Sequence, residues 1–175
     1  KEIALRDIRA SLSKFPEKKV LLRPDEGISF SVLQEVWIEV AIGGQVEVAF
    51  EVPASSGNRP PEQLTLPFTG IPRPSTFKPM PRISVEIGEL GDVYLNGGSL
   101  IEDGFDPDMK ELTSLLRRER ELRDQMIHSG RASREVAELF VNISCHPTTE
   151  YRALANVFNA CLAAEVNHFY PPNFG

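Results

Sequence analysis

The chain has only two cysteines in 175 residues, Cys145 and Cys161, and no long apolar run. Two thiols exclude a disulfide-rich scaffold and a zinc site built from four thiolates. No stretch reaches the roughly 18 apolar residues that a membrane-spanning helix needs, and the first residues lack the basic and apolar regions of a signal peptide. The net charge of −6 argues against a nucleic-acid-binding surface, because phosphate binding needs a basic face.

Composition and proline placement predict a globular chain in three parts. Hydrophobic residues make up 41% and charged residues 25%, which is typical of a folded domain. Eight of the 14 prolines lie between Pro53 and Pro81, where neither a helix nor a central strand can run. We therefore expect a first unit over 1–52, a proline-rich linker or strap over 53–81, and a second unit over 82–175.

The first unit has the pattern helix–strand–helix–strand. Apolar residues at helical spacing predict a helix from Leu5 to Phe15, and a short apolar run predicts a strand at Val20–Leu22. A second helical pattern begins at Phe30 and continues to Val40. Polar and apolar residues then alternate over Gln45–Phe50, as they do in a half-buried strand.

The second unit begins with a hairpin and ends with another strand–helix–strand pattern. Its expected elements are the hairpin strands Ile83–Ile87 and Val93–Leu95, an acidic insertion Glu102–Asp108, a long charged helix Met109–Met126, a short helical piece Arg134–Leu139, a strand Phe140–Ser144, a helix from Pro147 to Cys161, and a last strand Val166–Tyr170 that Pro171 and Pro172 end.

The two units share one order of elements. Placing Val20 on Val141 aligns 31 residues without a gap, at an offset of 121. The alternative is that any two strand–helix–strand segments look alike. If the units are related, the first one lacks its hairpin, which would precede Lys1. The predicted fold class is α+β, with two related small mixed-sheet units, helices packed on one face of each sheet, and the proline-rich strap between them.

The hairpin and the two strand–helix–strand segments resemble a known family. Ile83–Ile87 followed by Asp92–Gly97 resembles the opening hairpin of the periplasmic domain of the ExbD/TolR family. Phe140–Ser144 with Tyr151–Phe158 resembles the last strand–helix–strand unit of that domain, and Val20–Asp25 resembles the same strand in the first unit. Two copies in tandem and a long acidic insertion depart from the usual arrangement of the family.

The resemblance implies a non-enzymatic function in the periplasm. It implies a domain anchored to the inner membrane by a transmembrane helix upstream of this chain. Such domains form homodimers, associate with an ExbB/TolQ-like proton-channel protein, and use the proton motive force to act on a TonB- or Pal-like partner or on peptidoglycan. Two other hypotheses remain open: a soluble periplasmic protein- or peptide-binding module with a cleavable signal and no anchor, and a cytosolic hydrolase that uses Cys145 and a histidine.

Two strands are candidates for partner binding, because an exposed sheet edge can pair with an extended peptide or a second chain. The candidate residues are Gln45, Val46, Glu47 and Val48 in one strand and Val166, Asn167, His168, Phe169 and Tyr170 in the other. The alternative is that the chain's own linker, Leu64–Phe68, covers each edge.

The sequence predicts no catalytic, cofactor-binding or metal-binding residue. Cys145 and His146, with Cys161 and His168, could form a nucleophilic or metal site, but Cys161 falls on an apolar helix face and is better interpreted as core. The acidic residues of Glu102–Asp108 do not have EF-hand spacing, so a solvated loop is expected and a calcium contact is the alternative.

Overall fold

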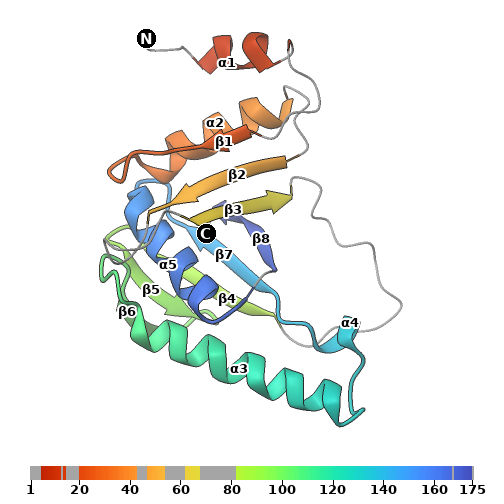
Figure 1. Cartoon of the computed structure of the whole chain (residues 1–175). Helices are drawn as coiled ribbons and strands as arrows, with labels where there is room; N and C mark the ends of the chain where they lie inside the picture. Colours follow the sequence, from red (N-terminus) through yellow and green to blue (C-terminus); the bar gives the residue numbers. More distant parts are fainter. Residues whose placement is uncertain are drawn as a thin grey trace.

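The computed structural model describes residues 5–12, 14, 20–42, 47–53, 62–67, 82–166 and 168–174 (Figure 1). Its elements in chain order are α1 (Leu5–Leu12), β1 (Val20–Leu22), α2 (Phe30–Ile42), β2 (Glu47–Val52), β3 (Glu62–Pro67), β4 (Ile83–Ile87), β5 (Asp92–Leu95), β6 (Ser99–Asp103), α3 (Lys110–His128), α4 (Arg134–Ala137), β7 (Val141–Cys145), α5 (Tyr151–Ala163) and β8 (Phe169–Phe174).

The strands form two mixed sheets. The first has the order β1-β2-β3, with β1 parallel and β3 antiparallel to β2. The second has the order β6-β5-β4-β7-β8, in which β4, β7 and β8 are parallel neighbours and β5 and β6 extend the sheet antiparallel. The predicted combination of helices with mixed sheets is therefore confirmed.

The two parallel strand pairs that flank a helix have the same register. In the first sheet Val20 lies opposite Val48, and in the second Val141 lies opposite Phe169. Each residue of the second pair is 121 positions after its counterpart in the first. The helices α2 and α5, which connect these strands, begin at positions that also differ by 121. This is the offset at which the two segments align in sequence.

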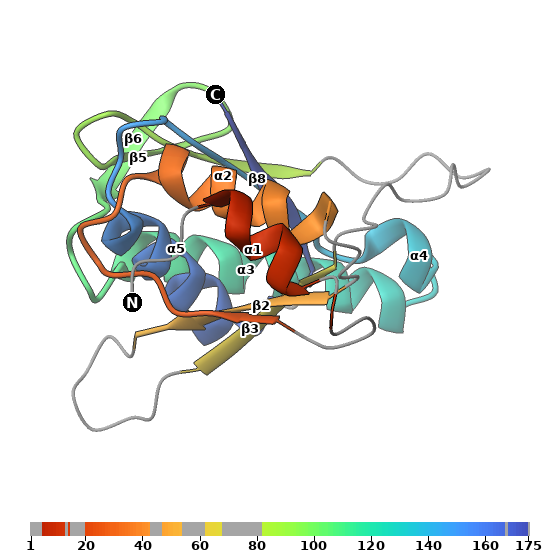
Figure 2. The same cartoon turned by 90° about the horizontal axis from the view of Figure 1, so that it is seen from above.

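The buried apolar side chains of both halves form one continuous core. Helix α5 lies at its centre, because residues on nearly all of its faces are buried. It packs against α3 on one side and contacts β2 on the other, while α1 packs on α2 (Figures 1 and 2). In the first half Trp37 of α2 meets Phe50 of β2 edge to face, with ring centroids 5.3 Å apart.

Four backbone hydrogen bonds join the segments that precede α2 and α5. The amide of Phe30 donates to the carbonyl of Thr149 at 2.8 Å, and the amide of Tyr151 donates to the carbonyl of Ile28 at 2.7 Å. Phe30 and Tyr151 are 121 positions apart, and so are Ile28 and Thr149. Exchanging the two halves therefore turns the first bond into the second.

A second pair of bonds follows the same rule. Ser31 donates to Pro147, and Arg152 donates to Glu26, each at 2.9 Å. An isolated antiparallel bridge between Ser29 and Glu150, which also differ by 121, lies in the middle of the set. The junction between the halves is thus reciprocal at five positions.

Two predicted elements need correction. The last strand was expected to end before Pro171, but β8 contains both Pro171 and Pro172. Proline is tolerated there because β8 is an edge strand in the described part of the chain, with β7 as its hydrogen-bonded neighbour. In addition, the predicted acidic insertion begins within a strand, β6, which pairs with β5. The turn before it contains Asn96 and Gly97 at φ 51° and 80°, the left-handed angles that such tight hairpin turns require.

Candidate functional site

The first predicted binding edge lies inside a sheet. Glu47 and Val48 belong to β2, which has β1 on one side and β3 on the other, and Val48 is fully buried. The prediction of a free edge here is wrong, because the proline-rich linker supplies Glu62–Pro67 as the second neighbour. This is the alternative in which the chain's own linker covers the edge. Gln45 and Val46 lie outside the described residues.

The second predicted edge is at the end of the five-stranded sheet. Phe169 and Tyr170 belong to β8, which is the outermost strand in the hydrogen-bonded order. Strand β3 of the first sheet contacts β8, so the chain itself lies next to this edge as well (Figure 1). The prediction that the strand begins at Val166 is wrong, because Val166 and His168 precede β8; Val166 is buried and His168 is exposed. Asn167 lies outside the described residues.

A polar cavity of about 220 Å³ lies beside His168. Its wall contains residues of both charges from α3, α4 and the segment before β8. Arg120 forms an ion pair with Glu165, and the Nε2 atom of His168 lies 2.9 Å from the Oε1 atom of Glu138. Three arginines and three carboxylates line the wall, so the cavity has no strong preference for an anion or a cation.

Arg123 in the wall of this cavity is an unusual residue, because it is charged and only 3% exposed. Its Nε atom donates to Glu119 at 2.9 Å, and its Nη1 atom donates to the carbonyl of Glu138 at 3.2 Å. The guanidinium group therefore ties α3 to the segment that follows α4. A Glu and an Arg four positions apart are typical of the solvent-exposed side of a helix, whereas this pair includes a buried arginine.

A second cavity of about 390 Å³ lies between α3 and the strands β4 and β5. Leucines from both sides line it, together with Arg82, Arg118 and Arg123. Neither cavity wall contains a serine, threonine or cysteine. The two cavities therefore offer no hydroxyl or thiol nucleophile from these three residue types.

Both cysteines are buried as free thiols. Burial raises the pKa of the Cys145 thiol to about 12, although a hydrogen bond with Thr149 opposes the shift. Burial raises the pKa of Cys161 further. The neighbouring His146 places its Nδ1 atom 2.8 Å from the hydroxyl oxygen of Thr148. Because the thiolate is the nucleophile, these features argue against the hydrolase hypothesis.

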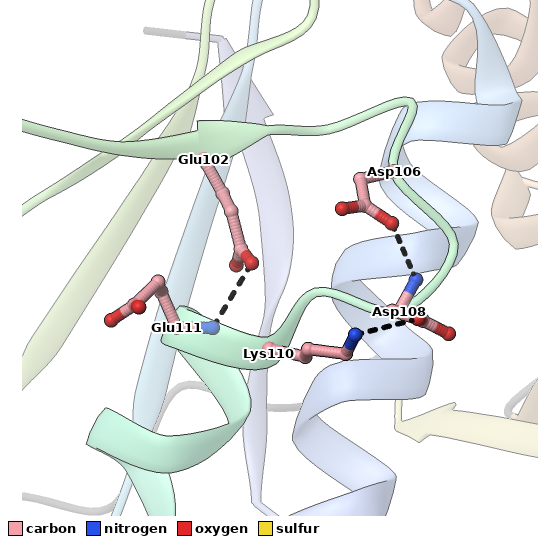
Figure 3. A network of polar contacts seen from close by, with 5 residues as sticks. All are labelled: Glu102, Asp106, Asp108, Lys110 and Glu111. Carbon is pink, nitrogen blue, oxygen red and sulfur yellow. Dashed lines mark hydrogen bonds and ion pairs between the residues drawn. The ribbon is translucent and has the colours of Figure 1, made fainter.

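The first carboxylate of the acidic insertion, Glu102, has a structural role. Glu102 in β6 accepts a hydrogen bond from the amide of Glu111 at 3.0 Å (Figure 3). It accepts a second one, also at 3.0 Å, from the amide of Leu112. These amides are at the start of α3, where the helix cannot supply acceptors itself. Met109 occupies the N-cap position with φ 39° and provides no side-chain cap. Glu102 therefore caps α3 from a neighbouring strand, with a charge that suits the helix dipole.

The other acids of the insertion make local contacts. Asp103 accepts from the amide of Phe105 at 2.8 Å, and Asp106 accepts from the amide of Asp108 at 2.9 Å. Asp108 also pairs with Lys110 at 3.2 Å (Figure 3). Within the described residues no three His, Cys, Asp or Glu side chains are grouped so that they could hold a metal ion. The insertion is therefore a turn that these carboxylates order.

The comparisons with known proteins do not identify the chain. A scan of protein-family models, a search of curated proteins and a search of solved structures each give no match. None of the helices in the described ranges is long and apolar enough to cross a bilayer. The arrangement of the two halves and the resemblance of their motifs remain as the features of the chain that indicate a function.

Proposed function

We propose that this chain is the periplasmic part of an ExbD/TolR-like subunit in a proton-motive-force-driven inner-membrane complex. In this proposal it is a non-enzymatic protein made of two related units. A membrane anchor precedes it, and an ExbB/TolQ-like proton-channel protein holds that anchor. The domain transmits force to a TonB- or Pal-like partner or to peptidoglycan.

The reciprocal junction between the halves is the observation that supports this proposal. In a twofold-symmetric dimer, if residue i of one subunit contacts residue j of the other, then j also contacts i. The pair Phe30 to Thr149 and Tyr151 to Ile28 obeys that rule at the offset of 121, as does the bridge between Ser29 and Glu150. A random pair of strand–helix–strand segments has no reason to meet in this way. Two related units that meet across a twofold axis, as the subunits of a dimer do, would meet in this way.

The same observation bears on the proposed homodimer. Family resemblance predicts that two chains associate, whereas the reciprocal junction already pairs two units in one chain. Multi-angle light scattering of the purified 175-residue chain distinguishes these arrangements. A mass near 19.5 kDa means that one chain takes the place of a dimer, and twice that mass supports the homodimer.

The functional test uses the full-length gene product in bacterial membranes. We expect it to remain with the inner membrane after a high-salt wash, and we expect this domain to be cleaved by protease added to spheroplasts. We also expect an ExbB/TolQ-like protein to co-purify with it in mild detergent. A photo-crosslinker in the domain should form different crosslinks after the proton motive force is collapsed with an ionophore.

Three outcomes would contradict the proposal. A full-length product that is released as a free periplasmic protein after signal cleavage favours the soluble binding module. A product protected from protease in spheroplasts but cleaved in lysed cells places the domain in the cytosol. Crosslinks that do not change when the ionophore is added remove the coupling to the proton motive force.

A further inference from the structure

Among the residues that the structure describes, strand β1 has a free edge where its counterpart β7 does not. Strand β7 pairs with β8 on one side and with β4 on the other. Strand β1 pairs with β2 in the same register, but no other strand in the described part of the chain pairs with it. The unpaired side of β1 is the side that corresponds to the β4 side of β7.

The burial of the two strands differs in the same sense. Val141 and Ile143 of β7 are completely buried, whereas their counterparts Val20 and Leu22 of β1 are half-buried. All four side chains are aliphatic (valine, leucine or isoleucine), so the difference in burial does not come from side-chain type. It reflects what covers each strand.

The helices beside the two strands show the same difference. Ala153 of α5 is buried next to the loop that follows β6. A Cβ atom built at Gly104 in that loop would lie 3.2 Å from the Cβ atom of Ala153. The counterpart of Ala153 in α2 is Val32, which is 42% exposed. In the second half, therefore, β4 covers the strand edge and the loop at Gly104 covers this part of the helix.

The order of the chain shows where such a cover would come from. Strand β6 continues into α3, α3 packs on α5, and β7 follows. Helix α1 packs on α2 and precedes β1 in the same way. A hairpin equivalent to β4 and β5 would thus precede α1.

We propose that the free edge of β1 binds a β-hairpin from polypeptide that precedes α1. Its first strand runs parallel to β1 and lies opposite Val20–Leu22, as Ile83–Val85 lies opposite Val141–Ile143. The segment that follows the hairpin, equivalent to the loop at Gly104, covers Val32. This inference rests on the proposed two-unit architecture, and it identifies the segment through which force from a membrane anchor would enter the sheet.

The chemistry of the hairpin follows from its counterpart and from charge. Residues 82–103 carry five acidic side chains and one basic one, and apolar residues alternate along β4. Residues 1–23, by contrast, carry seven basic and three acidic side chains. An acidic hairpin with alternating apolar residues is therefore complementary to the N-terminal part of this chain.

The first experiment uses a synthetic peptide of residues 82–105 as the probe, so that it includes the loop residue Gly104, which lies against Ala153 in the second half. It is added to the isotope-labelled 175-residue chain, and amide hydrogen exchange is measured by NMR. We expect exchange at β1 amides to slow at least tenfold in excess peptide, while exchange in β7 stays unchanged. A peptide of the same composition in scrambled order should have no effect. No slowing at β1 with millimolar peptide overturns the proposal.

A pair of protein variants tests whether the peptide covers the predicted face. Val32→Asp should weaken peptide binding at least fivefold, because it places a carboxylate against an acidic, apolar ligand. Leu90→Asp is the matched control, since Leu90 is 77% exposed in the turn between β4 and β5, away from β1. This variant should bind the peptide as tightly as the parent chain does. Equal binding by the two variants overturns the proposed placement, provided that both have the circular dichroism spectrum of the parent.

The source of the hairpin is tested on the full-length gene product. Exchange at β1 should be slow without peptide and should remain slow when the protein is diluted. Fast exchange, or protection that is lost on dilution, overturns the proposal, because the cover would then be absent or come from a second copy. Protection that appears only when another protein is added overturns it as well. If β1 is protected but no channel protein co-purifies, the proposed function is wrong and the hairpin proposal stands. If a channel protein co-purifies but β1 is not protected, the hairpin proposal is wrong and the proposed function stands.

Discussion

The hydroxyl group of Tyr151 donates a hydrogen bond of 3.0 Å to the backbone carbonyl of Glu51, 100 positions earlier in the chain. This bond ties the first turn of α5 to the end of β2. We predict that Tyr151→Phe lowers the free energy of unfolding by about 1 kcal/mol, because the carbonyl loses a donor in a half-buried place. Urea unfolding followed by Trp37 fluorescence measures the change.

Tyr94→Phe serves as the control for this prediction. Tyr94 is half-buried on β5, and its ring lies beside Gly88. Removal of its hydroxyl should change the free energy of unfolding by less than about 0.5 kcal/mol. Equal losses in the two variants would mean that the bond to Glu51 does not hold the halves together.

Glu102 should be a stronger stabiliser of α3 than an acid within that helix. Glu102→Ala removes the acceptor of two amides at the start of α3, and we expect a loss of about 1–2 kcal/mol. Glu111→Ala removes an exposed acid from the first turn and should cost less than about 1 kcal/mol. Thermal unfolding of both variants gives the comparison, and a larger loss for Glu111→Ala would contradict the capping role.

Gly104 should tolerate no side chain. Its amide donates to the carbonyl of Gly91 at 2.9 Å, and a Cβ atom at position 104 would collide with that same oxygen. It would also press on Ala153 and Val93. We expect Gly104→Ala to destabilise the fold by about 3 kcal/mol or to prevent folding.

Gly98→Ala is the matched control, because a Cβ atom there meets no other atom within 4 Å. Its effect on the melting temperature should be small. A Gly104→Ala variant that melts at the parent temperature would show that the loop after β6 is not held against α5.

The buried guanidinium group of Arg123 should matter more than its exposed neighbours on α3. Arg123→Met keeps the apolar stem but leaves Glu119 and the carbonyl of Glu138 without their donor, so we expect a loss of about 2–3 kcal/mol. Arg118→Met changes an exposed residue and should be nearly neutral. Guanidinium chloride would screen ion pairs, so urea is the denaturant to use. Similar midpoints for the two variants would contradict the structural role of Arg123.

Alkaline pH should unfold the protein through three buried groups. Cys145, Cys161 and Tyr151 have raised pKa values in the folded chain, chiefly because burial disfavours their charged forms; for Tyr151 the Glu51 carboxylate adds repulsion. A group whose pKa is higher in the folded than in the unfolded chain stabilises the fold fully at pH values below its unfolded pKa. That stabilisation is lost as the pH rises from the unfolded pKa to the folded pKa. For Cys145 the loss runs from pH 9.0 to about 12. Each group steepens the decline by up to about 1.4 kcal/mol per pH unit.

Urea unfolding at increasing pH measures this decline, and a Cys145→Ala, Cys161→Ala double variant should show a shallower slope. In the same samples, iodoacetamide should leave both native thiols unmodified near neutral pH and modify them after unfolding. Rapid alkylation of native Cys145 would contradict its burial and would revive the nucleophile hypothesis.

Local patterns predicted the elements that depend on periodicity. The strand Val20–Leu22 has the predicted bounds, and the helix predicted to begin at Phe30 does so. The hairpin strand Ile83–Ile87 also agrees, because its apolar residues alternate and all of them are buried. Each of these elements has a hydrophobic repeat that a short window of sequence contains in full.

The features that the sequence did not reveal depend on distant segments. Gln45–Phe50 has the same alternating pattern whether or not Glu62–Pro67 pairs with it, so its position inside a sheet could not be predicted from the strand itself. Arg123 has a helical partner in Glu119, but its burial depends on Glu138, which belongs to another segment. Strand β6 was missed although Asn96–Gly97 before it is a recognisable hairpin turn.

Helix α5 also sets the order in which the chain can complete its fold during synthesis. The carbonyl of Glu51 leaves the ribosome 100 residues before the hydroxyl group that binds it. At about 5–20 residues per second, the first half waits roughly 5–20 s for that partner. During this interval the face of β2 that α5 will cover is exposed to the cell. A chaperone that binds apolar strands would therefore encounter the nascent chain before its second half exists, and a stop codon after the proline-rich linker would leave that face permanently open.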